Sequence, residues 1–224
     1  MIPAFEVKEG ARIVTLAADL LLATSTDQIG RTGSDLRRAC GDLKANADIY
    51  IVKNMIGDKL SRAFDLARKS GATLNEFNRI RTTVIAEPVE TLIGALIKNS
   101  SISFSLQQMS MVVVDIKFTS REDVERVRDE LHPAFHDAEE VAADEMALMV
   151  YRGLVSLHAA VTFHLSQTAR PLPQMLSYRF AMPKPTLILS QRLYYTATRA
   201  DELREENKVV HPAFAPREGR ALGF

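Results

Sequence analysis

Four prolines fall within one short segment of the sequence and divide the chain into two unequal parts. They are Pro171, Pro173, Pro183 and Pro185. Proline fixes φ and has no amide N–H, so no helix can persist through such a segment. The sequence therefore predicts an extended strap at 171–185, a helical body at 1–170 and a small module at 186–224.

Apolar residues in the body recur mainly at helical spacing. Ser34 is the predicted N-cap of one helix, and Thr73 with Glu76 has the spacing of a capping box for another. Ser70–Gly71 is a predicted helix stop, and Pro88 is a predicted interruption. The predicted helices cover 9–24, a segment from 35 onward, 48–69 as one helix, a segment after 73 and a segment through 92–97.

Three more helices are expected before the strap. Residues 101–118 mix strand-like alternation with a continuous apolar run, and their context favours a buried helix. A long helix begins at Thr119–Glu122, a second segment with capping-box spacing, and Pro133 could kink it. Residues 142–169 carry apolar side chains near heptad spacing, so this helix and the preceding one are expected to pack as an antiparallel pair.

The C-terminal module reads as strand, helix, helix and strand. Thr186–Leu189 is a β-prone run, 190–195 a helical turn, 199–207 a helix capped by Thr198, and 219–224 a final strand. Asn207 is the expected left-handed stop of the second helix. The fold class is thus mainly α, a helical bundle followed by a small α+β module. Because the module is so small, it should lean on the body or on a partner.

Charge and cysteine content restrict the possible partners and compartment. The 28 basic residues balance the 28 acidic ones, so DNA binding has no electrostatic support. The single cysteine, Cys40, rules out an intrachain disulfide and fits a reducing cytoplasm. No uninterrupted apolar stretch is long enough to span a bilayer, and the start of the chain lacks the pattern of a signal peptide. We therefore expect no membrane span and no export by a signal peptide.

The sequence offers no convincing catalytic or metal-binding pattern. His132 and His136 have the i, i+4 spacing of metal ligands, but Pro133 lies between them and exposed or core histidines are the better interpretation. Arg37 and Arg38 could lower the pKa of the Cys40 thiol, although an inert buried thiol is the default. Phosphate loops, nucleophile elbows and zinc-protease patterns are missing from the sequence. We expect no enzyme, no catalytic or metal residues and no cofactor.

Aromatic residues concentrate in the C-terminal module, which is too small to bury them all. Tyr195 and Phe224 are therefore candidates for a protein interface. Phe214 is a further candidate, although it could instead form a small core with Tyr194. The charged helix after residue 198 is usually solvated, but Arg199 and Glu202 could set the register of a partner. The candidate interface residues are Tyr195, Arg199, Glu202, Phe214 and Phe224.

The module also carries a family resemblance. The residues that carry it are the run Leu189-Ser-Gln-Arg-Leu-Tyr-Tyr-Thr-Ala-Thr-Arg-Ala-Asp-Glu-Leu203, then Asn207, then His211-Pro-Ala-Phe-Ala-Pro216. Upstream, Phe118-Thr-Ser-Arg-Glu-Asp-Val, Arg128–Asp129, Leu172–Pro173 and Tyr178 continue the pattern. Over about 118–224, and more loosely before it, the chain resembles the DNA circularization (circulation) proteins of Mu-like phages. Two departures stand out: the family usually carries an extra N-terminal domain, and its Gly-Asp is replaced here by Tyr195–Thr196.

The resemblance implies a structural protein of the virion rather than a DNA-binding one. It implies a component of a contractile tail baseplate hub, an adaptor between the tail tube and the central hub. Its partners would be the tube, the hub, the tape measure and other copies of itself, with threefold or sixfold symmetry. The C-terminal module would resemble a LysM module, which tail proteins use as an adaptor.

Two alternatives remain open at this point. A LysM-like module could bind peptidoglycan, although the sequence of the glutamate-rich helix does not indicate a groove for a glycan. The chain could also act as a tail assembly factor in the host cytoplasm. Direct binding to DNA ends is suggested only by the family name, and the zero net charge argues against it.

Overall fold

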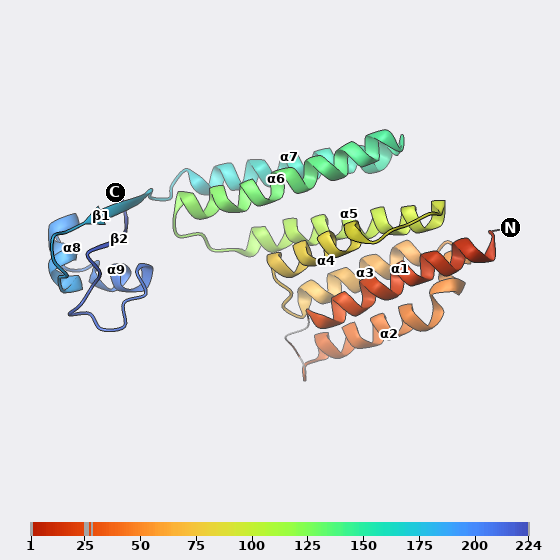
Figure 1. Cartoon of the computed structure of the whole chain (residues 1–224), viewed down its shortest axis with the longest axis horizontal. Coiled ribbons are helices and arrows are strands. Elements are labelled where there is room, and N and C mark those ends of the chain that lie inside the picture. The colour runs from red at the N-terminus through yellow and green to blue at the C-terminus, as the bar shows by residue number, and fades with distance from the viewer. Residues whose placement is uncertain (1, 25–26, 28, 224) are drawn as a thin grey trace. The chain divides into compact units, whose positions relative to one another are not determined.

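The computed structural model describes residues 2–24, 27 and 29–223 (Figure 1). These residues form two compact units. The first holds the chain up to Ile116 together with Leu131–Thr162, and the second holds Lys117–Glu130 with the chain from Phe163 onward. The described residues are mainly helical, with nine helices and one small sheet, which confirms the expected mainly α class.

Five helices open the first unit: α1 (Ala4–Ala23), α2 (Arg31–Val52), α3 (Ile56–Lys69), α4 (Leu74–Ala86) and α5 (Leu92–Asp115). α2 packs on α1 and α3, and both of these pack on α5, which also contacts α4. The core between them includes Phe64, whose ring stacks with Phe77 at 6.4 Å between centroids. This bundle confirms that the first part of the chain is helical, as its apolar spacing predicted.

Glu9 joins α1 to the start of α5. Its carboxylate accepts hydrogen bonds from the backbone N–H groups of Glu90 (3.0 Å) and Thr91 (2.8 Å) and from the Thr91 hydroxyl. These donors lower the pKa of Glu9, the Thr91 hydroxyl most of all. At the next residue, a Cβ on Gly10 would lie only 2.8 Å from Ile97, so the glycine permits close packing of α1 on α5.

α5 is rich in serine, and five of its serine hydroxyls bond to the backbone of the same helix. Each hydroxyl donates to the carbonyl four residues earlier, at 2.8 to 2.9 Å. They belong to Ser100, Ser101, Ser103, Ser105 and Ser110. A hydroxyl bonded in this way can be buried without a partner on another helix. The expected helix at 101–118 is confirmed as far as Asp115, within a longer helix, and it is buried on one side only, since Met111 and Val114 are exposed.

Two helix boundaries differ from the sequence-based prediction. The second helix begins at Arg31 rather than after Ser34, because the Asp27 carboxylate receives the N–H groups of Gly30 (2.6 Å) and Gly33 (3.2 Å). The predicted single helix over 48–69 is wrong, because Asn54 takes φ 54° and separates α2 from α3. The periodicity continues across that break, so apolar spacing alone could not reveal it.

The capping box at Thr73 is confirmed, with Glu76 bonding back to the Thr73 N–H at 2.7 Å. α3 ends at Lys69, and Gly71 has φ 99°, as expected for a helix stop. α4 ends before Pro88, as predicted.

α6 (Arg121–Asp144) and α7 (Leu148–Ala169) form a helical hairpin, seen in green and cyan in Figure 1. The predicted antiparallel pair is confirmed, but the second helix starts at Leu148 rather than 142 because Met146 turns the chain with φ 54°. α6 begins where predicted, but the capping box expected of Thr119 and Glu122 is wrong, because the Glu122 carboxylate accepts the Met175 N–H instead. Its cap is the Ser120 hydroxyl, which accepts the N–H of Asp123 at 3.2 Å. α6 runs through Pro133 as one helix.

The second unit contains β1 (Met175–Arg179), α8 (Thr186–Tyr194), α9 (Ala200–Glu206) and β2 (Glu218–Leu222). The two strands are antiparallel, with Met175 opposite Leu222. The order strand, helix, helix, strand agrees with the prediction, but the first strand lies inside the proline-rich segment. The predicted strand at 186–189 is wrong, since these residues begin α8.

The predicted start and stop residues of α9 are also wrong. Thr198 does not cap α9; its hydroxyl lies 3.0 Å from that of Thr196, and the N-cap position is Arg199. Asn207 has φ −95°, and the left-handed residue is Lys208 with φ 50°. Asn207 instead uses its side chain, which bonds to both the N–H and the carbonyl of Arg220. The core of the module is apolar and buried: Tyr178, Leu189, Tyr194, Leu203, Ala215 and Ala221.

Candidate interaction surfaces

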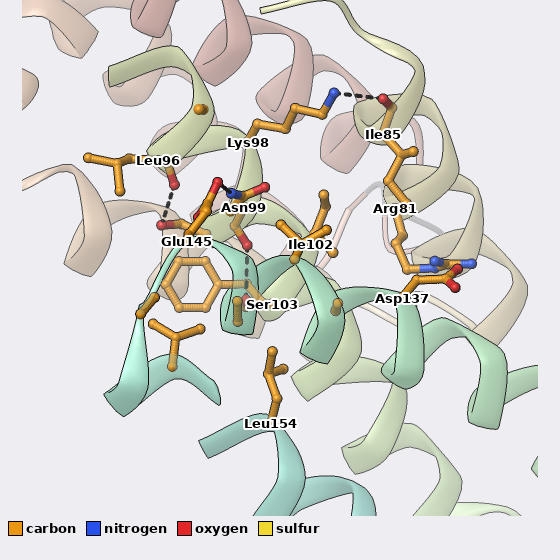
Figure 2. A pocket seen from close by; sticks show the side chains of 18 of the residues that line it. Arg81, Ile85, Leu96, Lys98, Asn99, Ile102, Ser103, Asp137, Glu145 and Leu154 are labelled. Atoms are coloured by element: carbon orange, nitrogen blue, oxygen red, sulfur yellow. Dashed lines mark hydrogen bonds between the residues drawn. The ribbon is translucent and has the colours of Figure 1, made fainter. Parts of the chain in front are cut away.

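A pocket of about 670 Å³ lies between α4 and α5 on one side and the first-unit part of the α6–α7 hairpin on the other (Figure 2). Most of its lining is apolar, including Ile85, Leu96, Val141, Val150 and Leu154. All of these except Leu154 are also substantially exposed to solvent. The pocket is therefore open and apolar, a form that accepts apolar groups of a ligand or a partner.

The polar residues of the pocket are largely engaged with other parts of the protein. Lys98 donates to the carbonyls of Ile85 (2.7 Å) and Glu87 (2.8 Å) at the end of α4. Asn99 donates to Glu145 at 2.6 Å. Figure 2 shows the Arg81 and Asp137 side chains directed toward each other.

The turn end of the hairpin exposes an unusual amount of apolar surface. We call residues 137–155 the hairpin end. Met146 and Met149 are 90% and 81% exposed. The other exposed apolar side chains of the hairpin end are Val141, Leu148, Val150, Tyr151 and Val155. Such a group of exposed apolar side chains marks a surface that another molecule covers.

α7 is the one helix in the described part of the chain that is long and apolar enough to cross a membrane by length and composition. Only 17% of its most apolar window is buried. The sequence predicted no membrane span because no apolar stretch of sufficient length is uninterrupted. Arg152 lies within α7, and His158 is bonded to its neighbours on α6. Length and composition alone are weak evidence of a membrane span, and a partner protein could cover the same apolar face.

The hairpin end is strongly acidic. Its acidic residues are Asp137, Glu139, Glu140, Asp144 and Glu145, and its one basic residue is Arg152. The chain as a whole has zero net charge, so the excess of positive charge lies elsewhere. Glu140 and Asp144 are exposed and flank the apolar residues of the hairpin end.

A basic surface lies on α2. We call the exposed side chains of residues 31–55 the α2 face. Its exposed basic residues are Arg31, Arg37, Arg38, Lys44 and Lys53, whereas Asp48 is its one exposed acidic residue. Ile49, Val52 and Met55 are exposed at the same end of α2 as Lys53. Arg31 and Arg38 form ion pairs with Asp35, and Lys44 forms one with Asp19. The α2 face is therefore basic chiefly at Arg37 and Lys53, and it is partly apolar.

A chain of three polar side chains connects α6 and α7 within the first unit. His158 Nδ1 lies 2.9 Å from Glu139 Oε1, and His158 Nε2 lies 3.0 Å from His132 Nδ1. If Nδ1 of a neutral His158 donates to the carboxylate, its Nε2 must accept from His132. The Phe135 ring stacks on His158 at 4.9 Å. This chain aligns the two helices.

The sequence had paired His132 with His136, but the structure pairs it with His158. Helix spacing could not reveal this contact, because it depends on the register between two helices. No cluster of three or more potential metal ligands occurs among the residues that the structure describes.

Cys40 is fully buried, and burial raises the pKa of its thiol to about 12. The suggestion that Arg37 and Arg38 lower this pKa is therefore wrong, since both arginines are exposed while the thiol points into the core. The default interpretation of an inert buried thiol agrees with this environment.

The interface candidates of the module have different surroundings. Tyr195 is 85% exposed and Phe214 73% exposed, so Phe214 does not join the small core that Tyr194 occupies. Arg199 lies over the Tyr194 ring and forms two hydrogen bonds with Glu202, at 2.9 and 3.0 Å. Arg199 and Glu202 therefore support the module from within. Phe224 lies outside the described residues.

Tyr195 also has an unusual backbone conformation. It ends α8 with φ 59°, in the left-handed region that glycine adopts most easily. The resemblance had placed a glycine at this point of the motif. The structure thus keeps a left-handed turn with an aromatic residue in it.

No protein-family model matches the chain, and no curated protein matches it significantly.

Proposed function

We propose that this chain is a structural component of a contractile phage tail, an adaptor in the baseplate hub between the tail tube and the central hub. The observation that carries the proposal is the hairpin end, with its exposed apolar residues beside an open pocket. A surface of this kind needs a partner to cover it, as every subunit of a tail has. The resemblance over 118–224 is the reason for proposing a phage tail as the assembly.

The C-terminal module supports the same proposal. Its order β1–α8–α9–β2, with an antiparallel strand pair, is compatible with a LysM-like fold. We propose that it acts as a protein adaptor, with Tyr195 and Phe214 as contact residues because both are exposed aromatic side chains. We further propose that the chain is not an enzyme and is located in the virion tail.

The peptidoglycan-binding alternative has less support. The loop before α8 and the loop before β2 bond to each other through their backbones: Ala215 donates to the Lys184 carbonyl at 3.1 Å, and Thr186 donates to the Pro212 carbonyl at 2.8 Å. The N–H groups of Ala215 and Thr186 are therefore already bonded and are not available as donors to a sugar chain.

Cryo-electron microscopy and mass spectrometry of purified tail particles from the source test the proposal. We expect this chain in the particles, with density in a symmetric ring at the distal end of the tube. Fully assembled tails that lack the chain would refute the structural role. In that case a pull-down on purified peptidoglycan separates the glycan-binding alternative from a role in assembly alone.

A further inference from the structure

The first unit has two outer faces of opposite charge. α2 packs on α1 and α3, whereas the hairpin lines the pocket with α4 and α5. α2 and the first-unit part of the hairpin therefore lie on opposite sides of the bundle (Figure 1). The α2 face is basic, and the hairpin end is acidic.

We propose that copies of this chain associate head to tail, with the α2 face of one copy docked on the hairpin end of the next. The inference deepens the proposed function and rests on it for the closed ring. Two different surfaces on opposite sides of one subunit make a heterologous contact, which propagates and closes into a ring when the rotation permits.

Both surfaces offer apolar groups as well as charges. Ile49 and Val52 project from the α2 face, with Val52 61% exposed. The open pocket beside the hairpin end is large enough to receive aliphatic side chains of this kind. Side chains that enter a pocket at the centre of an interface usually carry most of the binding energy. We therefore assign Ile49 and Val52 of one copy to the pocket of the next.

Charge selects this partner over a second hairpin end. Two hairpin ends facing each other would bring Glu140 and Asp144 of both copies together, and like charges across an interface oppose binding. The exposed Arg37 and Lys53 of the α2 face instead meet acidic side chains. The charge pattern thus favours a head-to-tail contact over a twofold one.

The test is a charge exchange measured by analytical ultracentrifugation and native mass spectrometry on the full chain. The hairpin variant carries Glu140→Lys and Asp144→Lys, and the α2 variant carries Arg37→Glu and Lys53→Glu. Each alone should weaken self-association at least about tenfold, because it places like charges at every contact. The chain carrying all four changes should regain most of the association.

Mixing the two variants gives a sharper result. A head-to-tail contact lets them alternate, because the unchanged α2 face fits the unchanged hairpin end and the two reversed surfaces fit each other. Such an alternating ring closes only with an even number of copies, so recovery in a closed ring indicates sixfold rather than threefold symmetry. The control chain carries Arg79→Glu and Glu125→Lys, at exposed positions outside both surfaces, and should associate like the wild type.

Several outcomes overturn the inference. A wild-type chain that stays monomeric at all concentrations does so, as does an oligomer that neither variant weakens. An α2 variant that associates like the wild type, while the hairpin variant does not, would indicate a twofold hairpin contact instead. Binding of the wild type to phosphatidylcholine vesicles, lost on Met149→Glu, would assign the apolar face to a bilayer. Each of these leaves the presence of the chain in tail particles, and so the proposed function, to be judged separately.

Discussion

Asn207 holds the strand residue Arg220 as a neighbouring β-strand would. Its side-chain oxygen accepts the Arg220 N–H at 2.7 Å, and its side-chain nitrogen donates to the Arg220 carbonyl at 2.8 Å. The same nitrogen bonds to the carbonyl of Leu203 in α9. One side chain therefore ties the last helix of the module to its last strand.

Asn207→Ala should release β2 from α9. The substitution removes the bonds to the exposed Arg220 N–H and carbonyl, at a cost of about 0.5–1.5 kcal/mol. Hydrogen exchange at the Arg220 amide, followed by mass spectrometry, should become faster. Gln191→Ala, which removes another amide side chain from the module, is the control and should leave this exchange unchanged. Equal protection in Asn207→Ala would show that the bonds contribute nothing to the module.

Gly219→Ala should destabilise the same corner for a steric reason. A Cβ there would overlap the Asn207 side-chain oxygen and lie 2.5 Å from the Tyr178 hydroxyl, in a core that has little room to move. Gly57→Ala is the matched control, because that helical glycine has open space around it and alanine is the better helix former by up to about 1 kcal/mol. Thermal unfolding should shift downward for the first and upward for the second.

Tyr195→Gly should stabilise the module while removing an exposed aromatic side chain. A left-handed backbone costs a non-glycine residue roughly 1–2 kcal/mol, which glycine avoids. We expect protection of the α8 amides to rise, and incorporation into tail particles to fall if Tyr195 is a contact residue. Tyr195→Ala, which removes the ring but keeps a Cβ in the left-handed region, separates loss of the ring from relief of strain. A less stable Tyr195→Gly chain would contradict the strain argument.

Glu9→Gln should reduce stability at neutral pH but not in acid. The folded-state pKa of Glu9 is lowered from the ordinary value of 4.5. Its stabilising effect is therefore present above pH 4.5 and is lost as the pH falls through the lower folded-state pKa. Unfolding curves at several pH values should show the two chains differing at pH 7 and converging in acid. The exposed Glu125→Gln serves as the control, and a difference that does not depend on pH would exclude the carboxylate as the cause.

Cys40 should react with thiol reagents only when the fold opens. Burial raises the pKa of its thiol to about 12, so little thiolate forms at pH 8 and the reagent cannot reach it. Alkylation of the native chain should be slow and should accelerate sharply in urea. Rapid alkylation of the native protein would show that α1 and α2 separate easily, because Cys40 lies in the buried face of α2.

The sequence predicted what depends on local pattern. The Thr73 capping box and the final strand near 219 follow from short-range rules, and both are present. The break at Asn54 was missed because the apolar spacing runs through it without interruption. The strand at Met175–Arg179 was missed because it pairs with residues about forty positions away, and the prolines around it indicated only an extended chain.

The interaction surfaces could be predicted even less from the sequence, because they depend on how the helices pack. Phenylalanine is a residue type typical of protein cores, and only the structure shows that Phe214 is exposed. His158 meets His132 through the register of two helices, which spacing along one helix cannot give. The opposed charges of the α2 face and the hairpin end are invisible in a zero net charge, because they emerge only when each helix has been assigned an outer side.

The serine-rich α5 has a consequence for how this protein can change over generations. Because each of the five hydroxyls is bonded within its own helix, no residue elsewhere in the core is tied to its presence. Substitution to alanine at these positions requires no compensating change and slightly favours the helix. The centre of the bundle can therefore drift widely in sequence while its geometry persists, and relatives of this chain could keep the fold after their similarity along α5 has faded.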